Sequence, residues 1–248
     1  MVWYLLSNNS SCTQCGKPVG SSYIQQLQQI ANNNTLANNV GTGIVQLSGR
    51  YSNMPQSING TTFTVGGKPE ILYVGGEFCP FCAVTRWSLV IALMRFGTFS
   101  NFTYMESSAT DMYADTPTFS FTNYSYTSDF VHFNGFEVYN RTDSTNILTP
   151  TGYTTQFQYV TNKYSTGGIP FSDFFNRSIQ SGAMISPHIL HGQNWNDVLQ
   201  QLQNSSSVDA QGIIATANIY TAYICKDNAT INATAPVCKQ KYVKDIIS

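Results

Sequence analysis

The sequence predicts an α/β domain, and two neighbouring segments carry most of that prediction. Residues 71–74 form a short apolar run between Pro69 and a pair of glycines, which is typical of a buried strand. Residues 83–96 are apolar with few exceptions and end at Gly97, which predicts a helix buried on most sides. A strand followed at once by a helix is a building unit of α/β domains.

The rest of the chain is predicted to extend this domain, which we place at residues 44–248. Residues 110–165 alternate in polarity and are rich in Tyr and Phe, which indicates a β-rich insertion. Residues 187–248 are predicted to form a helical extension. A tail and an amphipathic helix at 1–43 precede the domain.

Two cysteines stand between the central strand and the central helix. Cys79 falls at the predicted helix start, where unpaired N–H groups and the helix dipole favour a thiolate. Pro80 suits the first helical turn, and Cys82 lies about one turn further on. Cys79 is therefore a candidate nucleophile and Cys82 a candidate resolving thiol. An inert disulfide and half of a zinc site are the alternatives.

Three segments resemble a known family. Cys79-Pro80-Phe81-Cys82 after an apolar strand resembles the active-site segment of thioredoxin-like proteins, and GGIPFSDF at 167–174 resembles their cis-proline loop. With VDAQGIIATANIYTAYIC at 208–225, the chain is similar to thioredoxin-like surface proteins of thermoacidophilic archaea, whose function is mostly unassigned. The resemblance covers most of residues 17–238. It implies a thioredoxin-like fold in which Pro170 faces the dithiol.

The composition bears on partners and compartment. Only 10% of the 248 residues are charged, against roughly 25% in average proteins, and the net charge is −1. This balance gives no support to a nucleic-acid partner. A protein surface with so few carboxylates changes its charge little as the pH falls, which suits an acidic exterior.

Asn-x-Ser/Thr sequons occur more than twice as often as the composition predicts by chance, which indicates an extracellular, N-glycosylated protein. Compositional bias is the alternative. An even number of cysteines agrees with an oxidising compartment. The predicted glycan sites are Asn8, Asn9, Asn33, Asn59, Asn101, Asn123, Asn140, Asn176, Asn204, Asn228 and Asn232.

The N-terminal part is predicted to be mostly polar. Residues 1–6 are apolar but much shorter than a membrane helix, so we expect either the outer end of a membrane anchor or a packed strand. Cys12 and Cys15 are expected to form a loop disulfide, with a second redox centre or interchain links as alternatives. Residues 23–30 predict an amphipathic helix and 32–43 a loop.

Further strands are predicted around the central one. Residues 44–47 and 62–65 are candidates before it, and residues 101–106 should follow the central helix as a parallel neighbour. In the insertion we expect strands with a turn at Asn134-Gly135. Its aromatic residues are expected to pack in a core, or alternatively to form an apolar rim for substrates.

The segment after the insertion is predicted to hold a hairpin. Residues 171–175 and 177–180 read as two antiparallel strands. A cis bond costs little at an X-Pro peptide, and between Ile169 and Pro170 it would let the Ile169 backbone pair with a bound peptide.

The C-terminal third is predicted to be helical at 194–202 and 208–224. A disulfide between Cys225 and Cys238 would close the loop between them, which is worth about 3 kcal/mol on the chain-entropy model. His188 and His191 have the spacing of a shared helical face, but the sequence shows no third metal ligand nearby, so we predict no metal and no cofactor.

These observations predict an extracellular thiol–disulfide oxidoreductase that acts on cell-surface or secreted proteins. Cys79 would attack, Cys82 would resolve the mixed disulfide, and Pro170 would order the substrate strand. Arg86, one turn after Cys82, would favour a thiolate, and Glu77 would oppose it or carry protons. The alternative function is a glycosylated surface or filament-associated protein that keeps the fold without redox turnover.

Overall fold

The computed structural model describes residues 12–49, 52–142, 155–165 and 167–247. Its elements in chain order are α1 (Ser21–Ala31), α2 (Asn34–Val40), β1 (Gln56–Ser57), β2 (Thr64–Val65), β3 (Lys68–Gly76), α3 (Pro80–Met94), β4 (Gly97–Glu106), β5 (Pro117–Ser128), β6 (His132–Tyr139), α4 (Thr155–Val160), the π-helical turn η1 (Thr161–Ser165), β7 (Phe171–Phe174), β8 (Ser178–Ser181), the 3-10 turn η2 (Pro187–Leu190), α5 (Trp195–Gln201), the π-helical turn η3 (Ala210–Ile214), α6 (Ala215–Lys226), α7 (Ala229–Thr234), the 3-10 turn η4 (Pro236–Lys239) and α8 (Lys241–Ile247). The fold is mixed α/β, as predicted.

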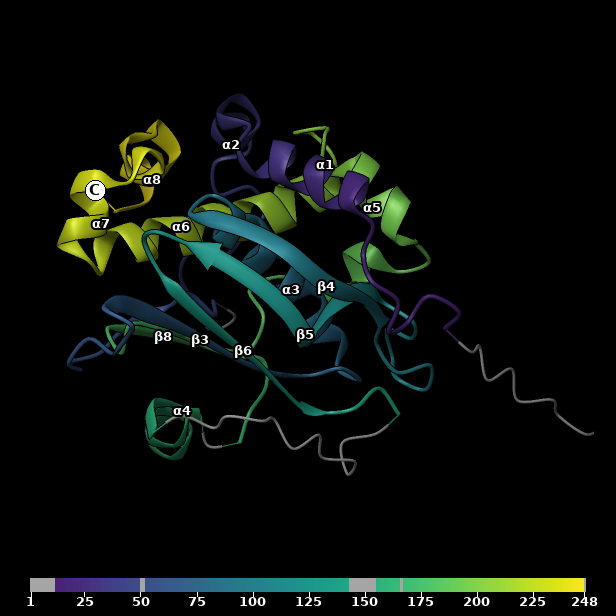
Figure 1. Ribbon diagram of the computed structural model, residues 1–248. Coiled ribbons are helices and arrows are strands. Elements are labelled where there is room, and N and C mark those ends of the chain that lie inside the picture. The colour runs from purple at the N-terminus through teal and green to yellow at the C-terminus, as the bar shows by residue number, and fades with distance from the viewer. Residues whose placement is uncertain (1–11, 50–51, 143–154, 166, 248) are drawn as a thin grey trace, which may run out of the picture.

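Strand β3 is the centre of the main sheet. It pairs in parallel with β6 and antiparallel with β7, and β8 continues the sheet beyond β7. The short strand β2 pairs with its first residues, and β1 with β8. Strands β4 and β5 form a separate two-stranded antiparallel sheet. Figure 1 shows α1, α5 and α6 on one side of the main sheet and α4 on the other.

The two faces of β3 belong to two apolar cores, because successive side chains of a strand point to opposite faces. Ile71 and Tyr73 lie in the larger core, which α3 fills together with α1 and α6. Leu72 and Val74 lie in a smaller core that Phe157 of α4 shares. Among the described residues, the face that α4 covers is therefore the more thinly covered one.

Several local predictions are confirmed. Helix α1 buries Tyr23, Leu27 and Ile30 on one face, and the hairpin β7–β8 turns at Phe175 and Asn176, both with positive φ. A tight turn with two consecutive residues in the left-handed region has a backbone twist that matches the twist of the two hairpin strands.

The N-terminal predictions are partly wrong. Residues 44–47 form no strand, and the predicted loop at 32–43 contains α2. The Asn33 side chain caps α2 by accepting a hydrogen bond from the Leu36 amide at 3.0 Å. An Asn cap followed by buried Leu36 and Val40 is enough for a short packed helix.

The predicted parallel neighbour of β3 is also wrong. The strand after α3 is β4, which pairs with β5, whereas the parallel neighbour is β6, from within residues 110–165. The turn expected at Asn134-Gly135 lies inside β6, opposite Leu72 and Tyr73. A Cβ at Gly135 would lie 2.9 Å from Phe121, so glycine here lets β5 pack closely on β6.

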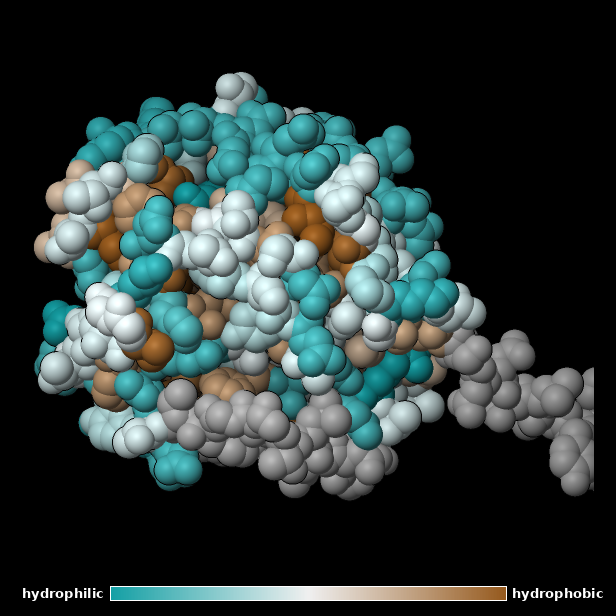
Figure 2. All heavy atoms as spheres, in the orientation of Figure 1, coloured by the Kyte–Doolittle hydropathy of each residue, from teal (hydrophilic) through white to brown (hydrophobic). Residues whose placement is uncertain are grey.

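Aromatic residues of 110–165 pack inward, in agreement with the core reading. Phe119, Phe121 and Phe133 are buried at 0–3% exposure. Phe121 and Phe133 contact each other and Phe99, and Phe119 contacts Phe102 edge-to-face. The visible face in Figure 2 is mostly hydrophilic or intermediate, with smaller hydrophobic areas between.

None of the helices in the described ranges has both the length and the apolar content needed to cross a membrane.

Candidate functional site: a buried dithiol at a helix start

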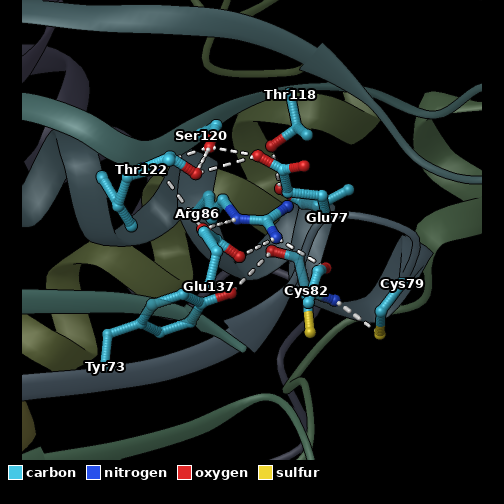
Figure 3. Close-up of polar contacts among 12 residues, drawn as sticks. Tyr73, Glu77, Cys79, Cys82, Arg86, Thr118, Ser120, Thr122 and Glu137 are labelled. Carbon is cyan, nitrogen blue, oxygen red and sulfur yellow. Dashed lines mark hydrogen bonds and ion pairs between the residues drawn. The ribbon is translucent and has the colours of Figure 1, made fainter. Parts of the chain in front are cut away.

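The dithiol is built by the junction of β3 and α3. Cys79 is the N-cap residue of α3 and Pro80 is its first residue, as predicted. The Cys82 amide donates a hydrogen bond to the Cys79 sulfur at 3.2 Å. The two cysteines are free thiols, and both are buried, with Cys79 6% exposed and Cys82 fully enclosed. Figure 3 shows the two side chains next to each other at the helix start.

The two thiols differ in acidity. A hydrogen bond from the Cys82 thiol lowers the pKa of Cys79, and it outweighs burial, which acts in the opposite direction; the Arg86 charge adds to the lowering. Burial raises the pKa of Cys82 well above its usual range. At neutral pH Cys79 is thus the sulfur more readily ionised, which is the asymmetry an attacking and a resolving cysteine need.

A buried ion pair lies beneath the dithiol. Arg86 Nε donates to Glu137 Oε1 at 2.8 Å and Nη2 to Glu137 Oε2 at 2.6 Å, while Nη2 also donates to the Gly76 carbonyl at 2.7 Å. Arg86 thereby joins α3 to β6 and to the end of β3 (Figure 3). Burial raises the pKa of Glu137, and Arg86 partly offsets this.

Glu137 is a site residue that the sequence analysis missed. It is 51 positions from Arg86 and lies in an aromatic strand with no motif around it. The only sequence signal was a buried Arg in an apolar helix, which requires an acidic partner somewhere in the chain.

Glu77 is held by β5 rather than by the thiols. Its Oε1 accepts hydrogen bonds from Ser120 Oγ at 2.6 Å and Thr122 Oγ1 at 3.0 Å, and the side chain is 7% exposed. Figure 3 shows this carboxylate on the Arg86 side of the helix start. The structure thus brings Glu77, Arg86 and the two cysteines together.

The Ile169–Pro170 peptide is cis, as predicted. In the β3–β7 ladder Phe171 pairs with Val74, so Pro170 and Ile169 continue beside the last residues of β3. Ile169 Cδ1 lies 3.1 Å from where a Cβ on Gly76 would be, so there is little room for a side chain at that position. The cis-proline loop therefore adjoins the end of β3 that leads to Cys79.

Phe81, between the two cysteines, is 43% exposed and contacts Tyr113 edge-to-face at 6.1 Å. Tyr113 in turn lies 6.3 Å from the His188 ring, and its neighbour Met112 is 83% exposed. Phe81 and Met112 thus expose apolar surface here, which agrees in part with the alternative expectation of an apolar rim for residues 110–165.

The other four cysteines form the two expected disulfides. Cys225–Cys238 joins α6 to η4, and Cys12–Cys15 closes a four-residue loop. The Cys12 and Cys15 sulfurs lie within 4.8 Å of a Glu106 oxygen, as metal ligands would. Because the sulfurs are bonded to each other, they do not offer the thiolates that a metal needs.

The sequons have different surroundings. Asn8 and Asn9 lie outside the described residues. The predicted glycan site Asn176 does not lie on the surface, since it is 2% exposed and donates from Nδ2 to the Thr61 carbonyl at 2.9 Å. The exposed sequon asparagines are Asn33, Asn59, Asn101, Asn123 and Asn204, and the half-buried ones are Asn140, Asn228 and Asn232.

Comparison with known proteins gives one result. No curated protein and no solved structure matches the chain. One family model matches residues 54–148 and 147–226, a range that includes β3, α3, the dithiol and the cis-proline loop. The chain belongs to this family, which is described as a domain of unknown function (DUF929).

Proposed function

We propose that this protein is a thiol–disulfide oxidoreductase of the thioredoxin-like class and that it acts on proteins outside the cell. The proposal rests above all on one observation. Two free thiols of opposite pKa direction, Cys79 and Cys82, lie at the start of a buried helix. A static disulfide needs no such difference in acidity, whereas exchange depends on it.

The topology around β3 supports the thioredoxin-like assignment. The strand that leads to the dithiol has a parallel neighbour, β6, and an antiparallel neighbour, β7, which follows the cis-proline. This is the environment that the resemblance of the CPFC and GGIPF segments implies. The hairpin β4–β5 would then be an addition between α3 and β6.

The proposed reaction proceeds in two exchanges. The Cys79 thiolate attacks one sulfur of a substrate disulfide, forming a mixed disulfide and releasing the other substrate sulfur as a thiolate, which takes up a proton. Cys82 then loses its proton and attacks the Cys79 sulfur, which releases the second substrate thiol. The substrate gains two electrons and two protons, and the protein is left with a Cys79–Cys82 disulfide.

The surrounding residues would assist each exchange. The positive charge of Arg86 lowers the pKa of both sulfurs, although for Cys82 burial outweighs it. The Glu137 carboxylate fixes the guanidinium in place. Pro170 would order an extended substrate segment alongside Ile169, and Phe81 would contact it on the exposed side.

An extracellular location is part of the proposal. Exposed sequon asparagines and two disulfides agree with export through an oxidising compartment in which proteins are glycosylated. The partners would then be thiols or disulfides of cell-surface or secreted proteins, and N-linked glycans would cover part of this chain.

One observation favours the second function, a glycosylated surface or filament-associated protein without turnover. Cys82 is wholly enclosed and Cys79 is only 6% exposed, so a partner disulfide has little access to either sulfur. In that case the two cysteines would serve only to hold the β3–α3 junction.

A trapping experiment decides between the two functions. Cys82→Ser removes the resolving thiol, so an oxidoreductase should accumulate mixed disulfides with other surface proteins as reductant-sensitive, high-mass bands. The matched control, Cys79→Ser, should give none. If Cys82→Ser traps nothing in preparations from the native cell surface while the double Ser variant is merely less stable, the oxidoreductase proposal fails.

A further inference from the structure

A pocket lies on the thinly covered face of the sheet. It has a volume of about 300 Å³ and is bounded by Val74 of β3, Val138 of β6, Phe157 of α4 and residues of η1. This is at the lower end of the range for ligand pockets, roughly 300–1,000 Å³, which suits a side chain better than a large cofactor.

The chemistry of the lining restricts what the pocket can bind. None of its lining residues carries a charge, and the floor is aliphatic and aromatic. At the η1 side, Thr161 Oγ1 donates to the Phe157 carbonyl and Ser165 Oγ to the Gly168 carbonyl, so both hydroxyls are already bonded. A charged group placed there would lose hydration without gaining a charged partner, whereas an apolar group loses nothing.

Two residues of the pocket lining adjoin residues next to the dithiol or the cis-proline. Tyr139 lines it, and the Tyr139 ring packs edge-to-face on the Phe78 ring at 5.8 Å, with Phe78 directly before Cys79. Ile169 also lines it and directly precedes the cis-proline. A substrate segment that lies along the cis-proline loop would therefore contact a residue of the pocket lining.

We propose that this pocket binds an apolar side chain of the substrate protein, aromatic or large aliphatic, located within a few residues of the reacting cysteine. The proposal rests on the oxidoreductase function and narrows its substrate class. The occupied pocket would complete the small core of Leu72, Val74 and Phe136, so the same hydrophobic burial that stabilises the fold would select the substrate.

The π-helical turn gives the pocket its shape. Such turns are rare and occur frequently at functional sites. Here η1 continues α4 directly and carries Thr161 and Ser165 to the pocket, with the exposed Asn162 at its rim. The side-chain amide of Asn162 is available to form hydrogen bonds with the backbone of a bound segment.

The test uses peptides that each hold one cysteine as a mixed disulfide with glutathione. Phe replaces Ser at one position at a time, within three residues on either side of the cysteine. The reduced protein is mixed with each peptide, the reaction is quenched with acid, and the released peptide thiol is quantified by mass spectrometry. With Phe at the favoured position, we expect a rate about tenfold or more above the all-Ser peptide, from the burial of one aromatic side chain.

Two pocket variants and a matched control follow. Thr161→Phe and Val138→Trp fill the pocket from different elements and should bring the Phe/Ser ratio close to one. Gln158→Phe adds the same side chain on the exposed side of α4 and should preserve the ratio. Equal rates for the Phe and Ser peptides in the unaltered protein would overturn the proposal, and so would an unchanged ratio in both pocket variants.

Two further measurements separate this proposal from the function it rests on. Oxidised glutathione has no apolar side chain, so a protein that fails to react with it and with every peptide lacks the oxidoreductase function. Binding of the favoured peptide with Ser in place of its cysteine, followed by fluorescence anisotropy, tests the pocket without any exchange. Saturable binding that Thr161→Phe abolishes and Gln158→Phe retains supports the pocket proposal whether or not the protein has the oxidoreductase function. The absence of such binding overturns the pocket proposal.

Discussion

Arg86 and Glu137 meet through two parallel hydrogen bonds of 2.8 and 2.6 Å in the interior, where Arg86 is fully buried and Glu137 is 3% exposed. The pair connects the dithiol helix to the parallel neighbour of β3. A buried pair of this kind does not by itself add much stability, since both charges lose their hydration. Its effect appears when one partner is removed.

We expect Arg86→Met to lower the free energy of unfolding at neutral pH by about 3–5 kcal/mol, because it leaves the Glu137 carboxylate buried without its partner. The pKa of Glu137 is already raised and would rise further, so the deficit should shrink as the pH falls and the carboxyl takes up a proton. Urea unfolding at pH 7.5 and pH 5 measures this. A deficit that is equal at the two pH values would contradict the assignment, and Arg86→Lys, which retains the charge, should cost less.

The same substitution should also affect the thiol. Since the Arg86 charge contributes to lowering the pKa of Cys79, Arg86→Met should raise that pKa and slow alkylation of Cys79 at a fixed pH. The rate of iodoacetamide labelling against pH, in the unaltered protein and the variant, gives both pKa values. Superimposable profiles would mean that Arg86 has only a structural role.

The Cys79–Cys82 pair, once oxidised, should be reduced before Cys225–Cys238. Cys79 lies at a helix start with a lowered pKa, whereas Cys225 and Cys238 are 0% and 2% exposed and clamp α6 to η4. Mild reductant followed by alkylation and peptide mapping should label Cys79 first. Equal labelling of all six cysteines, or lasting protection of Cys79, counts against a redox role.

Stability should rise in mild acid because of a second buried carboxyl. The pKa of Asp173 is raised to about 7, chiefly by burial and to a lesser extent by the charges of Glu70 and Asp227, while the Asn176 amide acts to lower it. The folded form binds the proton more tightly than the unfolded chain, where the pKa is about 3.9. The resulting stability is fully present below about pH 4 and is lost as the pH rises through about 7, a difference of about 4 kcal/mol.

Asp173→Asn tests this directly. The free energy of unfolding of the variant should depend less on pH between 4 and 8. At pH 8 it should be higher than that of the unaltered protein. Other charged and titratable groups lie around Asp173 and its neighbours, and they leave part of the pH dependence in place. These groups are Glu70, His132, Arg177, Lys226 and Asp227. A variant whose pH profile runs parallel to that of the unaltered protein would show that Asp173 is not the titrating group.

Glycan mapping of native material should separate exposed from buried sequons. Asn33, Asn59, Asn101, Asn123 and Asn204 are exposed and should carry glycan, whereas Asn176 should be bare because its side-chain nitrogen is bonded inside the protein. Enzymatic release of the glycans followed by peptide mass spectrometry reports each site. An intact mass equal to that of the bare 27.4 kDa chain would remove the main support for an extracellular location.

The sequence alone determined the local parts of the site. The strand before Cys79, the capped helix start with Pro80, and the cis bond at Pro170 were all expected from residue types and spacing. Each depends on interactions within about one turn or one peptide bond, such as a cap, a missing N–H or an X-Pro amide. Such interactions are encoded by neighbours in the chain.

The tertiary structure alone decided which distant segments meet. Residues 132–139 became the parallel neighbour of β3, Glu137 became the partner of Arg86, and the side chain of Asn176 turned inward. These outcomes depend on the joint burial of apolar faces and on pairing every buried charge, to which each segment contributes only part. A sequon or a lone buried Arg specifies that a surface or a partner is needed, and only the packed chain specifies where it lies.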